Sequence, residues 1–238
     1  MATIETVTSP KRFRAKTAFV FPERKRVLLE KEERCFLGVS LENKNFQAER
    51  IGAMLKWISA RFNQCELLIG DSIHRITLQT QMDIASEDAI NMAIDLGQQF
   101  IERTKEILSQ YECNTNFSFV TCHQLQSCTQ YHEYYEKLCS YHSINSAFRK
   151  SVEEFSVRYH KKDWGVLSEE DKKRKLNMST QYFLEEFAIF ACMVKNGSNI
   201  MIYPGTFSSL AEIADGKFPG VLYELENLTV VSLNVKRR

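Results

Sequence analysis

The stretch Cys35–Asn43, with the sequence CFLGVSLEN, marks the point where a predicted strand leads into a predicted helix. Its first residues form a short apolar run of the kind that makes a buried strand. A helical pattern follows, with apolar residues three and four positions apart between Ile51 and Phe62. Ser40 therefore lies at a strand-to-helix junction, and open α/β sheets bind ligands outside the carboxyl ends of their strands.

The rest of the chain alternates between strand and helix patterns. Periodicity predicts strands over residues 35–40, 66–71, 117–122, 199–203 and 228–235, and helices over 46–62, 86–108, 129–141, 144–162, 169–194 and 208–214. Residues 72–85 are read as a polar connection. The long helix from Ser86 has an expected apolar stripe of Ile90, Ile94, Gly97, Ile101, Thr104 and Leu108. This alternation indicates an α/β fold with parallel strands and right-handed crossovers.

Length and composition are those of an ordinary globular protein, with 238 residues, 44% apolar and 26% charged. No repeat or linker divides the chain, so we expect one domain over 1–238, with residues 1–16 flexible. The seven cysteines are odd in number and include no CxxC, which favours reduced thiols and no metal site. With no apolar run of ~20 residues, we expect a cytoplasmic protein without a membrane partner.

Several chemistries lack their sequence patterns. The chain has no GxGxxG and no GxxxxGK[ST], so a phosphate cradle for a nucleotide cofactor is missing. A hydrolase elbow requires GxSxG. Gly38 and Ser40 fit that pattern, but Glu42 replaces the second glycine and would hinder the tight turn, and no late histidine completes a triad. Such a serine is a poor nucleophile unless its substrate is already activated, as an amino-acid ester is.

Three segments resemble the signatures of the tRNA-dependent cyclodipeptide synthases. The first is residues 38–43 with the helix end at 56–62; the second is Tyr182 and Glu186, four apart on a helix; the third is Tyr203-Pro204 at a strand end. The likeness covers residues 35–205. It implies a Rossmann-like parallel sheet flanked by helices, similar to the catalytic domain of class I (Tyr/Trp-type) aminoacyl-tRNA synthetases, and no cofactor.

The resemblance also implies a reaction. Two aminoacyl-tRNAs would form a cyclic dipeptide, a 2,5-diketopiperazine, by ping-pong acyl transfer through an aminoacyl-Ser40 and then a dipeptidyl-Ser40 enzyme. The expected partners are these two tRNAs, with no DNA, and the expected state is a monomer. The alternative is a non-catalytic tRNA- or RNA-binding protein on the same scaffold, in which Ser40 is only a turn residue.

Roles for individual residues follow from this likeness. Tyr182 and Glu186 share one helical face, where they can hold the α-ammonium of the substrate. Tyr203 reaches the reacting centre and Gly38 leaves room for the backbone. Asn43 either caps the next helix or contacts substrate. The resemblance also implies that the side-chain pocket is lined by Phe36, Leu68, Cys122 and Ile189, with Tyr131 nearby. Each of the four lining residues could equally be an ordinary core residue.

The chain departs from the family pattern in two ways. Asn43 together with Pro204 is a mixed signature, which Pro204 assigns to the Tyr-Pro subgroup. Some members also carry a basic helix for tRNA in the region of 90–108, where this chain is mainly acidic. Phosphate contacts would then come from the basic runs at 11–16, 24–26, 149–150, 158–162 or 172–175, which are otherwise solvated surface.

Overall fold

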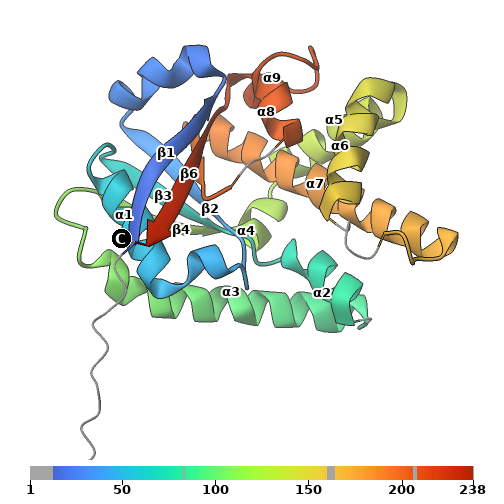
Figure 1. Cartoon of the computed structure of the whole chain (residues 1–238), viewed down its shortest axis with the longest axis horizontal. Coiled ribbons are helices and arrows are strands. Elements are labelled where there is room, and N and C mark those ends of the chain that lie inside the picture. The colour runs from blue at the N-terminus through green and yellow to red at the C-terminus, as the bar shows by residue number, and fades with distance from the viewer. Residues whose placement is uncertain (1–12, 83, 160–163, 206–207, 238) are drawn as a thin grey trace, which may run out of the picture.

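The computed structural model describes residues 13–82, 84–159, 164–205 and 208–237. Its centre is a six-stranded sheet in the order β1-β6-β5-β2-β3-β4, with helices on both faces (Figure 1). The strands are β1 Phe13–Phe21, β2 Arg34–Val39, β3 Gln64–Ile69, β4 Asn116–Thr121, β5 Ile200–Tyr203 and β6 Thr229–Arg237. The five strands β2 to β6 pair in parallel, which confirms the α/β fold class, and β1 joins β6 antiparallel.

The helices follow the strands along the chain. They are α1 Ala48–Ser59, α2 His74–Met82, α3 Ser86–Leu108, α4 Cys122–Gln126, α5 Thr129–Ile144, α6 Ser146–Tyr159, α7 Glu169–Lys195, α8 Ser208–Ala214 and α9 Tyr223–Asn227. Two 3-10 helices, η1 Glu23–Glu30 and η2 Lys44–Phe46, precede β2 and α1. No helix among these described residues is long and apolar enough to cross a membrane.

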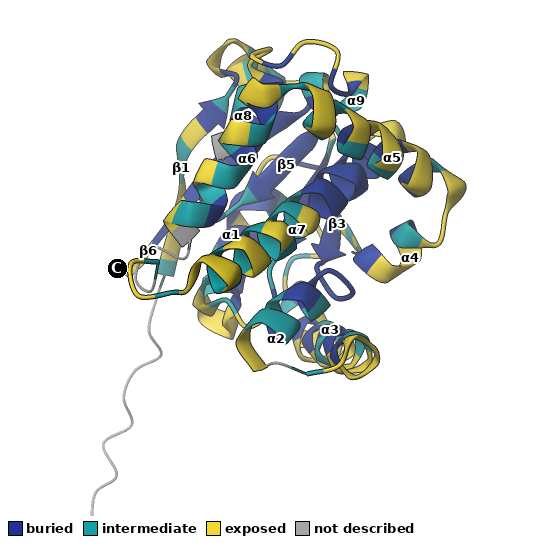
Figure 2. Cartoon of the chain, turned by 90° about the vertical axis from the view of Figure 1, so that its right-hand side faces the viewer, coloured by how far each residue is buried: buried dark blue, intermediate teal, exposed yellow. Residues whose placement is uncertain are grey.

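Both faces of the sheet are buried, which explains the unbroken apolar run in β2. Cys35, Leu37 and Val39 face a cluster formed with α1 and α3. Phe36 points the other way, into a cluster formed with α5, α6 and α7. Figure 2 shows the strands and the C-terminal half of α7 as the buried interior. With both faces covered, the ends of the strands are left as the place for a site.

The N-terminal expectations were partly wrong. Residues 13–16, expected to be flexible, begin β1, while residues 1–12 lie outside the described part. Because β1 is an edge strand, few of its side chains are buried, and its apolar alternation is too weak to read from sequence. The antiparallel pairing of β1 also corrects the expectation of parallel strands throughout.

Around α3 one expectation was wrong and another was confirmed only in part. Residues 72–85, read as a connection, contain α2, whose buried residues are His74, Ile76 and Leu78. On α3 the expected Gly97, Thr104 and Leu108 are buried, whereas Ile90, Ile94 and Ile101 are replaced in the buried stripe by their neighbours Ala89, Ala93 and Phe100. The small residues face inward because α3 lies close to the loop after β3: a Cβ on Gly97 would stand 2.7 Å from Cβ of Asp71.

The basic run Arg24-Lys25-Arg26 makes intramolecular contacts within η1 and beyond it. Arg24 pairs with Asp215 at 3.0 Å, and Lys25 Nζ donates to the carbonyl oxygen of Glu226 at 3.0 Å. Arg26 Nη2 donates to Glu23 at 2.9 Å. This run therefore ties η1 to the segment around α8 and α9. Of the run at 158–162, residues 160–163 lie outside the described part.

The contact at Gly97 generates a stability prediction. Gly97→Val should lower the free energy of unfolding by about 1–3 kcal/mol, because the added side chain overpacks the space against Asp71. The matched control is Gly165→Val, since a Cβ at Gly165 meets nothing within 4 Å. Urea unfolding of both variants measures the effect, and equal midpoints would contradict the close packing of α3 on this loop.

Candidate active site

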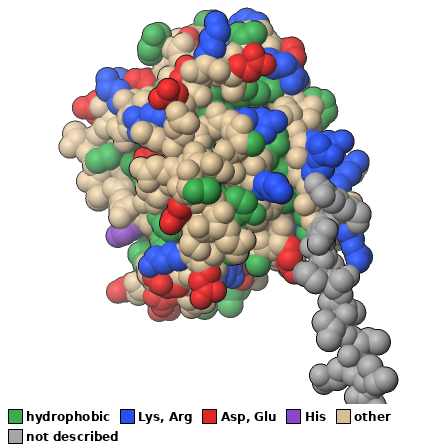
Figure 3. All heavy atoms as spheres, turned by 90° about the vertical axis from the view of Figure 1, so that its left-hand side faces the viewer, with side chains coloured by type: hydrophobic (Ala, Val, Ile, Leu, Met, Phe, Trp, Pro, Cys, Tyr) green, Lys and Arg blue, Asp and Glu red, His purple; other side chains and the backbone are tan. Residues whose placement is uncertain are grey.

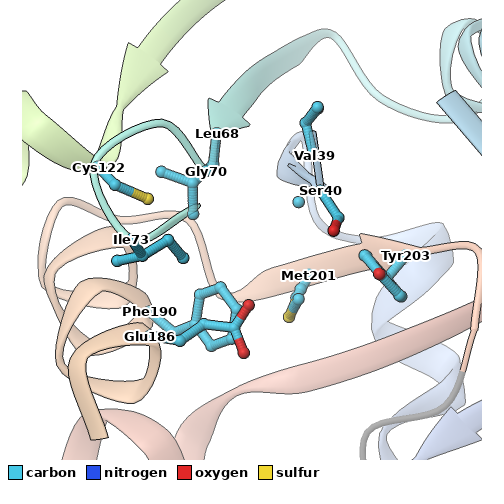
Figure 4. Close-up of a pocket in the computed structure, with 11 residues that line it drawn as sticks. Val39, Ser40, Leu68, Gly70, Ile73, Cys122, Glu186, Phe190, Met201 and Tyr203 are labelled. Atoms are coloured by element: carbon cyan, nitrogen blue, oxygen red, sulfur yellow. The ribbon is translucent and has the colours of Figure 1, made fainter. Parts of the chain in front are cut away.

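A pocket lies at the carboxyl ends of the central strands. It holds about 270 Å³ of empty space, including its mouth. Its walls come from β2, β3, β5, the start of α4 and the middle of α7 (Figure 4). The lining residues are Gly38, Val39, Ser40, Leu68, Gly70, Ile73, Cys122, Glu186, Phe190, Met201 and Tyr203. The pocket thus brings together three residues predicted to be catalytic, Ser40, Glu186 and Tyr203.

Ser40 begins the turn that follows β2. The amide of Asn43 donates to the carbonyl oxygen of Ser40 at 3.4 Å, and Glu42, at the third position, has φ 58°. A left-handed residue at that position is what a type II turn requires, and glycine or asparagine usually fills it. Glu42 does not prevent the turn, as the sequence had suggested, because it adopts this conformation itself. Its carboxylate bonds His74 Nε2 at 3.0 Å.

Glu186 is the buried acid of the pocket. Loss of solvation raises the pKa of its carboxyl to about 8, and a hydrogen bond with Tyr182 opposes that rise. Its Oε2 atom has no hydrogen-bond partner among the described residues. A carboxyl group with such a pKa exists in both protonation states near neutral pH, so it can accept a proton and return it. Tyr182, the fourth predicted catalytic residue, is not part of the lining but forms a hydrogen bond with Glu186.

Tyr203 is held at the end of β5 by its neighbours. Its ring packs against Phe46 of η2 with centroids 5.9 Å apart. Asn45 Nδ2 donates to the carbonyl oxygen of Pro204 at 3.2 Å, and Arg50 Nη1 donates to Asn45 Oδ1 at 3.0 Å. These contacts join the loop after β2 to the end of β5. The sequence offers Asn45 as a possible cap for the next helix, but its contact with Pro204 could not be predicted because the two residues lie far apart along the chain.

Gly38 provides space beside this strand end. A Cβ there would lie 3.1 Å from Met201 Cε and 3.6 Å from Tyr203 Cδ2. A larger residue would therefore push Met201 into the pocket or displace it. The prediction that Gly38 leaves room agrees with this packing, although the neighbouring atoms belong to side chains of β5.

The structure places two of the four residues predicted for the side-chain pocket in the lining of this pocket. Leu68 and Cys122 line the pocket, whereas Phe36 and Ile189 are fully buried and stand outside its lining. Ile73, Phe190 and Met201 complete the apolar wall. Burial first, then the charges of Asp71 and Glu186, raise the pKa of the Cys122 thiol well above its ordinary value. Cys122 is therefore a neutral, apolar wall residue.

Two further predicted residues have other contacts. Asn43 Oδ1 accepts from the amide of Asn45 at 3.0 Å, so its carbonyl caps η2, and Asn43 is outside the pocket lining. Tyr131, also outside the lining, accepts a hydrogen bond from Gln126 Nε2 at 3.3 Å. Of the two readings of Asn43, capping is the one that the geometry favours.

Tyr131 belongs to a buried polar network around Glu185. Arg75 binds both carboxylate oxygens of Glu185, at 2.9 and 2.6 Å, and Gln126 Nε2 donates to Oε2 at 3.0 Å. A bidentate pair of this kind satisfies a buried carboxylate. The network joins α2, α4 and α7 beside Glu186 and fixes the rotation of α7. No group of three metal-ligating side chains occurs in the described ranges of the chain.

The raised pKa of Glu186 generates a pH prediction. The unfolded carboxyl has a pKa near 4.5 and the folded one near 8, so between these values the folded state holds more protons and its stability falls as pH rises. Glu186→Gln removes this penalty. The stability of the variant relative to the wild type should therefore increase by about 1.4 kcal/mol per pH unit across this window. Urea unfolding at several pH values tests this, and a difference independent of pH would contradict the burial of a neutral Glu186.

Comparison with known structures gives the same fold. A cyclodipeptide synthase from Fluoribacter dumoffii superposes with TM-score 0.81 at 18% identity, covering 96% of this chain and 100% of the other. One from Candidatus Glomeribacter gigasporarum, solved bound to Phe-tRNAPhe, gives TM-score 0.69 at 18% identity, covering 90% and 94%.

A Mycobacterium tuberculosis protein, whose structure demonstrates that cyclodipeptide synthetases are related to type I tRNA synthetases, gives TM-score 0.71 at 13% identity, covering 97% and 96%. No curated protein matches the sequence. The family model named cyclodipeptide synthase matches residues 17–205, which include Ser40, Glu186 and Tyr203. Its enzyme class, an aminoacyltransferase, is the class expected from the three sequence signatures. The chain therefore belongs to the cyclodipeptide synthase family.

Proposed function

We propose that this chain joins two aminoacyl groups from tRNA into a cyclic dipeptide by ping-pong transfer through Ser40. The observation that carries the proposal is the meeting of Ser40, Glu186 and Tyr203 in one pocket, from three separate elements. Family membership supports the reaction class. The structure of a relative with Phe-tRNAPhe supports the choice of substrate.

In the first step the Ser40 hydroxyl attacks the ester carbonyl of an aminoacyl-tRNA. The bond from that carbonyl to the ribose oxygen breaks, the serine proton passes to the ribose oxygen, and an aminoacyl ester of Ser40 remains. A serine without a histidine suffices because the ester is already activated. Leu68, Ile73, Phe190 and Met201 offer apolar contacts, so the first side chain is apolar.

In the second step the amine on Ser40 must become a nucleophile. Glu186 takes a proton from the α-ammonium, for which a pKa of about 8 is well matched. The free amine attacks the ester carbonyl of a second aminoacyl-tRNA, the bond from that carbonyl to the ribose oxygen breaks, and the proton that the nitrogen loses on becoming an amide passes to the ribose oxygen. Glu186 keeps the proton taken from the ammonium and releases it to solvent before the next cycle. A dipeptide is left on Ser40.

In the third step the dipeptide closes on itself. Its terminal amine attacks the Ser40 ester carbonyl, the bond to Ser40 Oγ breaks, and the serine recovers its proton as the cyclic product leaves. Tyr203 and Glu186 lie in the same pocket as Ser40, where the phenol and carboxyl can orient the amine for this attack. Tyr182 holds Glu186 in place through their hydrogen bond.

We propose the ribbon formed by β1 and β6 as the surface that binds tRNA. Arg14 stands directly opposite Lys236, and both are exposed on the same face, while Ala15 and Val235 point inward. Like charges facing each other across two strands repel, so a bound anion relieves that repulsion. Figure 3 shows Lys and Arg side chains gathered along one margin of the molecule.

The topology directs this basic end toward the active site. β6 runs parallel to β5 and β2, and Tyr203 pairs with Ser232, so the residues from 233 to 237 continue past the end of β5. Five strand residues extend about 16 Å. The ribbon therefore extends beyond the end of β5, on the same edge of the sheet as the end of β2 that leads to Ser40. We infer that it holds the phosphates of the acceptor stem while the aminoacyl end enters the pocket.

Loss of the nucleophile is the central test. Ser40→Ala should give no aminoacyl adduct by intact-mass analysis after incubation with charged tRNA, and no diketopiperazine in the medium of an expressing host, with an unchanged melting temperature. Ser140→Ala, an exposed serine on α5, should behave as the wild type. If wild-type protein formed neither adduct nor product with any charged tRNA pool while still binding tRNA, the non-catalytic binding protein would be the better reading.

The ribbon makes a second prediction. The double variant Arg14→Ala with Lys236→Ala should bind aminoacyl-tRNA more weakly and reduce the slope of log affinity against log salt by about two units, one per lost phosphate contact. Mobility-shift titrations at several salt concentrations measure both. Lys195→Ala serves as the control, since Lys195 is an exposed lysine in the last turn of α7 and belongs to none of the basic runs considered for tRNA. If the wild type, the double variant and the control gave equal slopes, the tRNA would bind a surface other than the ribbon.

A further inference from the structure

Glu42 has an unusual backbone conformation for its residue type. It is the one non-glycine residue with positive φ among the described residues. A left-handed conformation costs an ordinary residue about 1–2 kcal/mol. Such a residue persists where its surroundings hold it in place. Glu42 is two residues after Ser40, inside the turn that presents the serine, so its restraint is also a restraint on the nucleophile.

His74 supplies that restraint from the first residue of α2. Its Nε2 lies 3.0 Å from Glu42 Oε2, and its side chain is 7% exposed against 56% for Glu42. The His74 amide donates to the carbonyl oxygen of Asp71 at 2.9 Å. Asp71 Oδ1 in turn accepts from the amide of His123 at 3.0 Å. Residues 71–74 therefore connect the turn after β2 with the start of α4.

The turn after β2 is held at two points. At one end Glu42 is fixed to His74, and at the other Asn45 is fixed to the carbonyl oxygen of Pro204. These contacts lead to the loop after β3 and to the end of β5, which are the strands on either side of β2. Ser40 lines the pocket together with residues of the loop after β3 and of β5. Its position therefore depends on both the Glu42–His74 contact and the Asn45–Pro204 contact.

We propose that Glu42 and His74 are a pair of positioning residues that hold the Ser40 turn in its reactive geometry. The proposal rests on the proposed function of Ser40. Neither residue lines the pocket, so neither touches the reacting atoms. The hydrogen bond supplies the restraint, with His74 Nε2–H donating to the exposed carboxylate. A displacement of about 1 Å at a nucleophile can slow a reaction about a hundredfold.

The test compares Glu42→Gly, Glu42→Gln and the double variant Glu42→Gly with His74→Asn. Glycine accepts the positive φ without strain, so Glu42→Gly removes the side-chain contact while preserving the turn and the fold. Glutamine keeps an oxygen that can accept from His74. Glu49→Gln, an exposed acid in the first turn of α1, is the control. The readouts are the single-turnover rate of adduct formation on Ser40, the affinity for charged tRNA, and hydrogen exchange of the amides at 41–45.

We expect Glu42→Gly to acylate tenfold to a hundredfold more slowly with unchanged tRNA affinity and faster exchange at 41–45. Glu42→Gln should stay within about threefold of the wild type, and the double variant should be no slower than Glu42→Gly, because both changes remove one contact. The proposed positioning role would be overturned if Glu42→Gly acylated and exchanged its amides at the wild-type rates. It would also be overturned if Glu42→Gln acylated as slowly as Glu42→Gly. If the wild type formed no adduct on Ser40, the proposed function would be overturned instead. Hydrogen exchange at 41–45 would still show whether the Glu42–His74 contact restrains the turn after β2.

Discussion

The position of β2 between β3 and β5 is the constraint on which the structure depends. Parallel pairing on both sides brings three strand ends to one edge. Each face of β2 is buried against helices, so a substrate cannot approach β2 through either face of the sheet. Ser40 follows β2 directly, Tyr203 is the last residue of β5, and Gly70 follows β3 directly. The site is thus a consequence of strand order, and the separation of its residues along the chain is incidental.

The burial of the Glu186 carboxyl provides the group at this edge that can exchange a proton. Glu186 points from α7 into a wall that is otherwise mostly apolar, and the lost solvation raises its pKa to about 8. The adjacent Glu185 faces Arg75 and is neutralised by a bidentate pair. Two neighbouring acids of one helix therefore have different roles: Glu185 is paired with Arg75 and fixes the helix, and Glu186 is left able to exchange a proton.

Local patterns predicted much of this arrangement. The alternation of strands and helices placed Ser40 at a strand end, and the spacing of four between Tyr182 and Glu186 placed both on one helical side. What the sequence did not reveal depends on packing between distant elements. Phe190 lines the pocket where Ile189 was expected, a difference of one residue in the rotation of α7. β1 lacked a periodic signal because an edge strand buries few side chains, and His74 looked like part of a polar connection although α2 buries it.

The pairing of β1 with β6 has a consequence for synthesis on the ribosome. Phe13 pairs with Arg237, so β1 leaves the ribosome long before its partner strand has been made. An unpaired strand edge is prone to wrong associations during this interval. The exposed Arg14 and Lys16 discourage such contacts, because charged edges repel one another. The charges that we propose to bind RNA phosphates thus also protect the nascent protein, and the ribbon is completed only when β6 has been translated.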